Sequence, residues 1–383
     1  MWKFRVVYFF LFGMYAIGVP YFQLLLDLLG YSPAQIGFLL GAFELAGVSG
    51  PFLMGTIADR TGRFRLLIVV SASLAVAALV PILRHPPFAL AMVFTAVLGF
   101  AFKTNVPLVD TMAGHLLPDP DHDYGRVRMW GSVAFAVVVV AVAKTGLINL
   151  TSVPSIAANL VIAVGLFLAS SFVFPRTIRH ESTRYTGKIQ QSPDTVSPWL
   201  YVTVGIVFLM NFGFAAYTSF FTLYLVNEVG LHDVSILWAI GAASEIPVIL
   251  LSGKLIRRFG PVSMLAAAGV SMIVRLVLYA GVPNVWAIAP AQMLHAVSFG
   301  VMHTASVAIV RILTPSHRRA FGQALYNGIG MGLALFTGAS LGGIIAEHFG
   351  YRIMYLWAVV PVVAGLALLL FVATPLRKAV HFR

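Results

Sequence analysis

Residues 55–63 read Gly55-Thr56-Ile57-Ala58-Asp59-Arg60-Thr61-Gly62-Arg63 and stand between two long apolar runs, residues 34–57 and 65–84. Glycine lets a chain turn tightly, and an aspartate at a helix end can accept hydrogen bonds from free backbone amides. The pattern therefore predicts two apolar helices that are joined by a tight, charged turn.

Apolar residues dominate the rest of the chain as well. Of its 383 residues, 60% are hydrophobic and 10% are charged, whereas a soluble domain has about 25% charged residues. A run of about 20 apolar residues crosses a bilayer as a helix. The sequence predicts an all-α membrane protein with twelve spans, at residues 4–28, 34–57, 65–84, 88–113, 128–149, 154–174, 199–226, 234–256, 261–281, 285–312, 322–346 and 351–373.

The basic residues are unevenly distributed between the loops. Of the 25 lysines and arginines, all but Arg84, Lys103, Lys144, Arg275 and Arg352 fall in one set of loops and termini. Basic loops stay in the cytoplasm, so both termini and the middle loop are expected there. This distribution explains the net charge of +12 without nucleic acid. The first apolar run is too long for a secretory signal and is expected to be a retained helix.

The chain divides into two related halves. The longest polar stretch predicts a linker at 176–198, between six-helix bundles at 1–175 and 199–383. Two dipeptides have counterparts 200 residues later in the chain. Ala96-Val97 recurs as Ala296-Val297, and Lys103-Thr104 corresponds to His303-Thr304. Transporters built from duplicated halves bind their substrates near the middle of the membrane, where the repeats meet.

The segment at 55–63 resembles the signature loop of the major facilitator superfamily, Gly-x-x-x-Asp-Arg-x-Gly-Arg. The resemblance implies the major facilitator fold, with two pseudo-symmetric bundles, and a cytoplasmic latch that favours one conformation. The second copy of the loop has Arg257 where the aspartate would be, which argues against a latch there. The expected latch residues are Gly55, Asp59, Arg60, Gly62 and Arg63.

A narrower resemblance runs from about residue 106 to 350. Its pieces, which are similar to the phenylpropionate permease family, include Val106-Pro107-Leu108-Val109-Asp110, Gly125-Arg126-Val127-Arg128-Met129-Trp130-Gly131 and Gln292-Met293-Leu294-His295. That family is related to lactose permease, a proton-coupled sugar symporter. The resemblance maps the substrate-binding arginine of lactose permease onto Arg128, its acidic partner onto Asp110 and its ninth-helix arginine onto Arg275. Its His–Glu constellation finds no counterpart at the matching positions, so the proton route is left open.

Charged side chains also lie inside the predicted spans. A charge at membrane depth is costly and therefore faces a partner or a cavity. Lys103 and Asp110 are seven residues apart and so share one helical face, while Arg128 opens the fifth span. Structural pairing is the alternative to a functional role, with Asp110 bound to Arg128 or Lys103, Glu44 to Lys103, and Arg275 to Glu245.

A guanidinium group binds a carboxylate through two parallel bonds, and a carboxyl group away from water can carry a proton. His295 and His303 are eight residues apart, with Phe299 between them on the same face. Aromatic residues in the spans that usually line the cavity include Tyr15, Phe22, Phe100, Tyr217, Phe221 and Trp238. We expect substrate contacts from Arg128, Lys103, Asp110, Trp130, His303 and Arg275, and proton coupling from Glu245, Glu44, Asp110 and His303.

The sequence contains no cysteine and no nucleotide-binding loop, nucleophile elbow or zinc-protease motif. Neither an enzyme nor a metal or other cofactor is therefore expected. The favoured interpretation is a monomeric secondary transporter in the bacterial inner membrane. It would use the proton gradient to import a small organic solute, an aromatic or other carboxylate. The alternatives are a proton-coupled sugar or nucleoside symporter, a drug–proton antiporter and a non-transporting membrane receptor.

Overall fold

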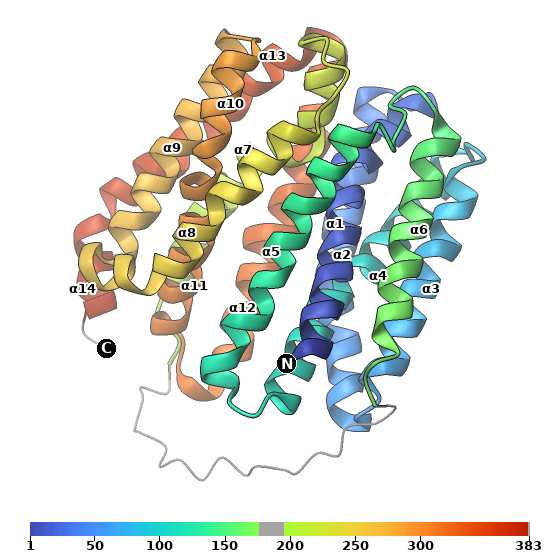
Figure 1. The fold of residues 1–383 in the computed structure, drawn as a ribbon. Coiled ribbons are helices and arrows are strands. Elements are labelled where there is room, and N and C mark those ends of the chain that lie inside the picture. The colour runs from blue at the N-terminus through green and yellow to red at the C-terminus, as the bar shows by residue number, and fades with distance from the viewer. Residues whose placement is uncertain (176–194, 382–383) are drawn as a thin grey trace. The chain divides into compact units, whose positions relative to one another are not determined.

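The computed structural model describes residues 1–175 and 195–381, most of which are helical (Figure 1). The first six helices are α1 (Trp2–Leu28), α2 (Pro33–Thr61), α3 (Phe64–Ile82), α4 (Phe88–Leu116), α5 (Pro120–Thr145) and α6 (Val153–Ser171). They are followed by α7 (Trp199–Leu223), α8 (Ser235–Phe259), α9 (Pro261–Gly281), α10 (Val285–Met293), α11 (Met302–Leu313), α12 (Arg319–Leu325), α13 (Ala334–Phe371) and α14 (Ala373–His381). Three π-helical segments interrupt the later helices, at Tyr224–Glu228, Ala296–Val301 and Tyr326–Leu333.

The apolar helices agree with the twelve predicted spans. Ten runs in the described residues are long and apolar enough to cross a membrane, and α8, which bends by 65°, adds another. One of the ten, Ser316–Phe371, has 56 residues and would be roughly 84 Å long as one straight helix. Gly350 breaks it at φ 82° and ψ 166°, a conformation that is nearly restricted to glycine. This run therefore supplies two spans, and the predicted fold class is confirmed.

Backbone conformation reveals the duplication more clearly than the sequence does. Glycines with positive φ fall in corresponding loops of the two halves. In the described residues they are Gly30, Gly62 and Gly146 in the first half, and Gly230, Gly260 and Gly350 in the second. Each one lies where one helix ends and the next approaches, and glycine can adopt the positive φ that turns the chain there.

By its internal contacts the chain forms two compact units. Unit 1 comprises Met1–His180 together with Ser219–Ala243, and unit 2 comprises Glu181–Thr218 together with Ser244–Arg383. The end of α7 and the start of α8 thus pack with the first six helices. Most of the predicted linker, residues 176–194, lies outside the described residues, and the division into bundles at 1–175 and 199–383 stays a prediction.

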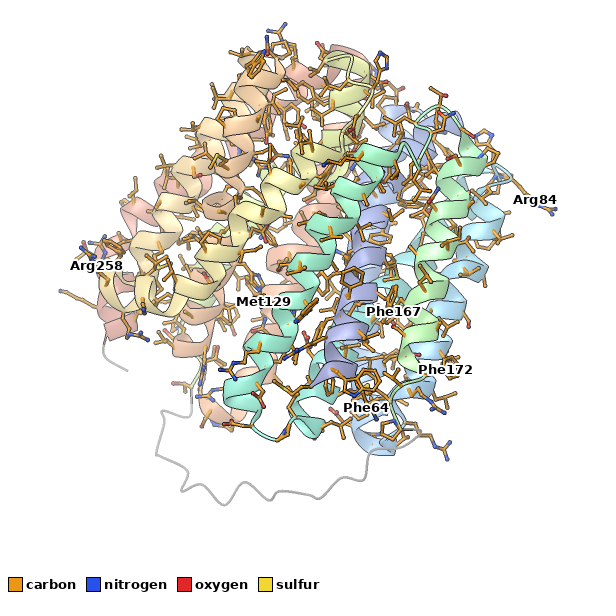
Figure 2. All side chains as sticks on the ribbon, viewed as in Figure 1. Phe64, Arg84, Met129, Phe167, Phe172 and Arg258 are labelled. Carbon is orange, nitrogen blue, oxygen red and sulfur yellow. The ribbon has the colours of Figure 1, made fainter. Side chains whose placement is uncertain are left out.

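In unit 1 the start of α1, the α2–α3 turn and the end of α6 meet at one end (Figures 1 and 2). The rings of Phe4 and Phe174 are 4.7 Å apart. Arg65 Nη1 donates a hydrogen bond of 3.0 Å to the carbonyl of Phe174, and its guanidinium lies over Phe172. α1 packs against α5 and α6, so the first apolar run is part of unit 1.

Glycines bring α2 and α4 into direct backbone contact. A Cβ atom on Gly99 would lie 2.1 Å from the carbonyl oxygen of Phe43, and one on Gly50 would lie 2.4 Å from that of Phe100. Small residues allow helices in membranes to approach in this way. The close approach sets the positions of Glu44 on α2 and Lys103 on α4.

Two predicted boundaries differ from the structure. α5 begins at Pro120, although its span was expected from residue 128, because a helix can continue past the membrane through polar residues. Arg128 therefore lies about two turns inside α5 and does not open it. The span expected at 285–312 consists of α10, a π-helical segment and α11, so its helix changes pitch next to His295.

Candidate functional site

The charged residues at membrane depth form two clusters, one in each unit. In unit 1 the first cluster surrounds Arg128 on α5. Its guanidinium carbon lies 4.0 Å from the centre of the Phe12 ring and 5.7 Å from that of Tyr8. A Cβ atom on Gly131 would lie 2.5 Å from the Phe12 ring and 2.9 Å from Arg128 Nη1. Glycine at 131 is therefore what allows the guanidinium to stack on Phe12.

Asp110 does not bind the cations that the sequence suggested. Its carboxylate accepts a hydrogen bond of 2.5 Å from the hydroxyl of Tyr8, 102 residues earlier in the chain. Tyr124 lies beside Asp110 and Arg128 and interacts with both. Within the described residues no carboxylate forms an ion pair with Arg128, so its guanidinium keeps donors that a ligand could use.

Lys103 pairs with Glu44, which was one of the structural pairings considered. The ammonium group contacts Glu44 Oε2 and lies 5.7 Å from the centre of the Phe43 ring. The Lys103 and Glu44 side chains remain 30% and 18% exposed, respectively. Although Lys103 and Asp110 lie two helical turns apart on α4, the structure gives them different partners. Asp110 and Lys103, one of the alternative pairings that the sequence left open, therefore do not form a pair.

In unit 2 the second cluster surrounds Arg275 on α9, which is 1% exposed. Its Nε donates to the Tyr279 hydroxyl at 2.8 Å and its Nη2 donates to Gln292 Oε1 at 2.5 Å. Nη1 lies 2.9 Å from His295 Nδ1 and donates to Ser298 Oγ at 3.2 Å. The guanidinium carbon also lies 3.8 Å from the centre of the Tyr217 ring. This burial is stable because every side of the guanidinium has a partner.

Glu245 on α8 belongs to the same cluster but does not bind Arg275 directly. Its Oε1 lies 2.6 Å from His295 Nε2, so His295 stands between the carboxylate and the guanidinium. The direct pair of Arg275 with Glu245, which the sequence left open as an alternative, does not form. The described side chains instead form a chain of three groups, in which Glu245 is 20% exposed at one end and Arg275 is buried at the other.

The two histidines share one helical face, as predicted. The Phe299 ring stacks on His295 at 5.4 Å and on His303 at 6.1 Å. His303 Nδ1 lies 2.8 Å from the Tyr326 hydroxyl. A π-helical turn has one extra residue. Phe299, which stacks between the two histidines, lies in the π-helical segment Ala296–Val301 that follows His295.

The remaining predicted residues lie apart from these clusters. Trp130 is half-buried and packs against the core of unit 1. Gly62 ends α2 with φ 65°, and its amide donates to the carbonyl of Ala58 at 2.7 Å, as expected for a tight turn. Asp59 is exposed and forms no ion pair with a described residue. The latch role of Gly55, Asp59, Arg60, Gly62 and Arg63 stays a prediction.

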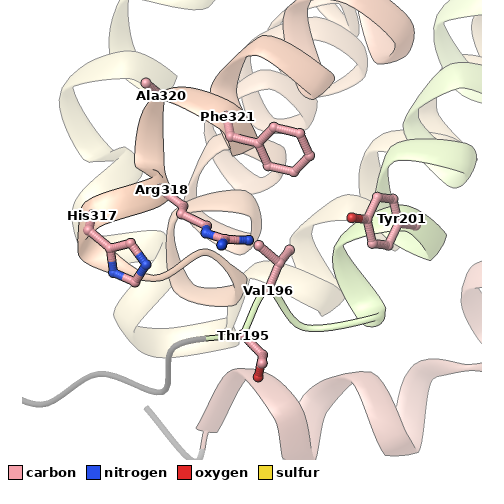
Figure 3. Close-up of a pocket in the computed structure, with 7 residues that line it drawn as sticks. All are labelled: Thr195, Val196, Tyr201, His317, Arg318, Ala320 and Phe321. Atoms are coloured by element: carbon pink, nitrogen blue, oxygen red, sulfur yellow. The ribbon is translucent and has the colours of Figure 1, made fainter.

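A separate hollow of about 630 Å³ opens at the start of α7 and the loop before α12 (Figure 3). It contains none of the predicted site residues. Its lining is Thr195, Val196, Tyr201, His317, Arg318, Ala320 and Phe321.

The sequence prediction missed several residues that the clusters depend on. Tyr8 and Phe12 on α1 carried no signal beyond being aromatic residues in an apolar run. Gln292 is fully buried beside Arg275, and a buried amide in a predicted span could have been recognised as a partner of an intramembrane charge.

Comparison with known proteins identifies the family of this chain. The model of the MFS_1-like family matches residues 1–357. The chain belongs to the MFS_1-like family. The "Probable 3-phenylpropionic acid transporter" of Escherichia coli (strain K12) is 29% identical over 92% of this chain and 93% of its own length. The maltose permease of Geobacillus stearothermophilus is 27% identical over 91% of this chain and 88% of its own length.

Solved structures share the fold. A point mutant of the nucleoside transporter NupG superposes with a TM-score of 0.85 at 15% identity, covering 96% of this chain and 98% of that one. A bacterial homologue of the human lysosomal transporter Spinster gives a TM-score of 0.67 at 16% identity, covering 99% and 96%. The MFS_1-like chain is therefore a membrane-spanning secondary transporter, and it is not an enzyme.

Replacing Arg275 by lysine should destabilise the protein. A lysine ammonium cannot reach Tyr279, Gln292, His295 and Ser298 together, and each buried partner left unsatisfied costs about 1–3 kcal/mol. We expect the free energy of unfolding in detergent micelles without ligand to fall by at least about 2 kcal/mol. Arg352→Lys is the control, because Arg352 donates one described bond, to the carbonyl of Ala280. Equal losses in the two variants would contradict the account of the cluster.

Proposed function

We propose that this MFS_1-like transporter is a proton-coupled symporter that imports an aromatic carboxylate. The observation that carries the proposal is the chain from Glu245 through His295 to the buried Arg275, which joins a partly exposed carboxylate to a fixed positive charge. No cofactor takes part in the proposed cycle, and the proton gradient drives it. The protein would act as a monomer.

The Arg128 cluster supports the choice of substrate. Its guanidinium has free donors for a carboxylate, and the planar fork of arginine matches the two carboxylate oxygens. The Phe12 and Tyr8 rings beside it offer apolar and aromatic surface. Aromatic rings beside one charged group suit the binding of a small aromatic acid. Asp110, held by Tyr8, is well placed to keep the fork oriented.

The Arg275 cluster supports proton coupling because it fixes the tautomer of His295. Arginine can only donate hydrogen bonds, so His295 Nδ1 accepts from Arg275. The ring proton of neutral His295 then lies on Nε2 and points to Glu245 Oε1. A proton that enters the cluster therefore binds the Glu245 carboxylate, which is also the more exposed member of the pair.

Charge balance explains why proton and substrate would move together. With Glu245 ionised and His295 neutral, the cluster has no net charge. Protonation of Glu245 leaves the charge of Arg275 uncompensated, and an anion that travels with the proton restores neutrality. Because moving net charge through a low-dielectric core is costly, joint movement is favoured over movement of either species alone. His303, which interacts electrostatically with Glu245, would take part in the same proton coupling.

A sugar symporter is the second candidate, and one observation favours it. The maltose permease relative covers 91% of this chain at 27% identity, close to the match of the phenylpropionic acid relative. We prefer the aromatic acid because the free donors of Arg128 and the adjoining rings suit a planar anion better than a polyol. Transport of maltose but of no aromatic acid would reverse the choice.

The proposed orientation places both termini in the cytoplasm of a bacterial cell, with the protein in the inner membrane. The distribution of the basic residues supports this orientation, and so does the meeting of the α1 start with the α6 end in unit 1. The turn at 55–63 would then lie on the cytoplasmic side, where Asp59 and its neighbours serve as the conformational latch.

Replacing Arg128 by lysine should abolish substrate binding while the protein stays folded. Lysine keeps the charge but loses the two parallel bonds, so we expect affinity for 3-phenylpropionate to fall at least about tenfold. Isothermal titration calorimetry on the purified protein measures this affinity, and thermal unfolding checks the fold. Arg126→Lys is the matched control, since the Arg126 side chain is 60% exposed. Unchanged binding by Arg128→Lys would refute the assigned role.

Replacing Glu245 by glutamine should uncouple transport from the proton gradient. Glutamine can still accept the hydrogen bond from His295 but cannot carry a proton. In proteoliposomes we expect loss of gradient-driven accumulation of 3-phenylpropionate, with exchange of labelled for unlabelled substrate preserved. Glu228→Gln, at an exposed position, serves as control. Accumulation by Glu245→Gln at the level of the control would show that another group carries the proton.

A further inference from the structure

A row of four aromatic rings joins Arg128 to Lys103 within unit 1. From the guanidinium the row begins at Phe12, whose ring stacks on Tyr15 with centroids 5.6 Å apart. The steps from Tyr15 to Phe102 and from Phe102 to Phe43 measure 4.5 and 5.8 Å. The row ends at the Lys103 ammonium, 5.7 Å from the Phe43 ring.

Glycines make room for the row at three points. Gly131 admits Phe12 and Arg128. A Cβ atom on Gly18 would lie 2.7 Å from the Phe102 ring, and one on Gly47 would lie 2.5 Å from Cδ of Lys103. Any side chain at these positions would push the rings or the lysine out of line. The row thus depends on the backbone of α1, α2 and α5 and is not a chance contact of flexible side chains.

The Lys103 end of the row differs from a sealed structural ion pair. Arg275 in unit 2 is 1% exposed and has a partner on every side, whereas Lys103 and Glu44 are 30% and 18% exposed. An ammonium has three donors, and Glu44 is the one described side chain that accepts from it. The remaining donors can serve a ligand, and so can the bond to Glu44 if a stronger anion displaces it.

We propose that the row is one binding surface for an aromatic acid that carries a second anionic group at its far end. The proposal rests on the proposed function, because Arg128 binds the first carboxylate in both. Lys103 exchanges Glu44 for the second carboxylate, and the ring of the ligand lies along Phe12 and Tyr15. Glu44, left without a partner at membrane depth, then takes up a proton.

The spacing along α4 between Lys103 and Asp110, which shares the neighbour Tyr124 with Arg128, suits such a ligand. Lys103 and the Tyr8-bound Asp110 are separated by seven residues on α4, or about 10 Å along the helix. Tyr8 and Tyr15 span the same distance on α1. A single benzene ring with a short acid arm at one end and a carboxylate at the other is of this size. Monoacids would fill the Arg128 end and leave the Lys103–Glu44 pair closed.

The test compares two ligands that differ in the second carboxylate, 3-phenylpropionate and 4-(2-carboxyethyl)benzoate. Calorimetry on the purified full-length protein, in two buffers of different ionisation enthalpy, gives affinity and proton uptake together. The variant is Glu44→Gln with Lys103→Gln, which removes the pair without leaving an unpaired charge. The control is Asp123→Asn with Arg126→Gln, which removes a pair of 3.9 Å in the same unit, whose arginine is 60% and whose aspartate is 14% exposed.

We expect the wild type and the control to bind the diacid at least about tenfold more tightly than the monoacid and to take up a proton with the diacid. The Glu44/Lys103 variant should still bind the monoacid but lose the preference for the diacid and this proton uptake. A wild type that binds both acids equally, or a variant that keeps the preference, overturns the inference and leaves the proposed function intact. Binding of neither acid overturns the proposed function, and the inference with it.

Discussion

A charge inside a membrane is stable only when protein groups replace the water that it has lost, and this constraint shapes both clusters. Arg275 satisfies it completely, through hydrogen bonds to Tyr279, Gln292, His295 and Ser298 and the ring of Tyr217. Arg128 satisfies it in part, by stacking on Phe12 and lying near Asp110 and Tyr124. Arg275 is therefore a fixed charge that orients the side chains around it, whereas Arg128 keeps hydrogen-bond donors that a ligand can use.

The two units therefore divide the chemistry between them. In unit 2 the buried guanidinium contacts His295 Nδ1, and in the proposed function the resulting tautomer directs an incoming proton to Glu245. In unit 1 the cations lie at the two ends of an aromatic row, and neither is sealed. In the proposed function, one half of the duplicated fold binds the proton and the other half binds the aromatic anion. Lys103 and His303, which occupy the same position of the repeat, show this divergence directly.

The fold was predictable from the sequence because its determinants are local. Apolar runs are long enough to identify spans, and Gly62 ends α2 with the left-handed conformation that the charged turn suggested. The continuous helical run Ser316–Phe371 was predicted as two spans, 322–346 and 351–373, and the φ and ψ angles of Gly350 give the physical reason for the division.

The partners of the charged residues were less predictable. The seven-residue spacing placed Lys103 and Asp110 on one face of α4. It could not show that α2 approaches α4 closely enough, at Gly50 and Gly99, for Lys103 to form an ion pair with Glu44. Asp110 accepts a hydrogen bond from Tyr8. Because Tyr8 lies 102 residues earlier in the chain, no sequence pattern predicts this contact. Pairing of this kind depends on how helices rotate and pack, which the pattern of a single helix does not contain.

The most direct test of the account is to measure substrate and proton movement together, in proteoliposomes that hold a pH-sensitive dye and start with equal pH on both sides. Addition of 3-phenylpropionate to the outside should acidify the lumen as the acid enters, when passive entry in protein-free liposomes is subtracted. Entry of the acid without any change in lumenal pH, or with a rise in pH, would contradict proton symport.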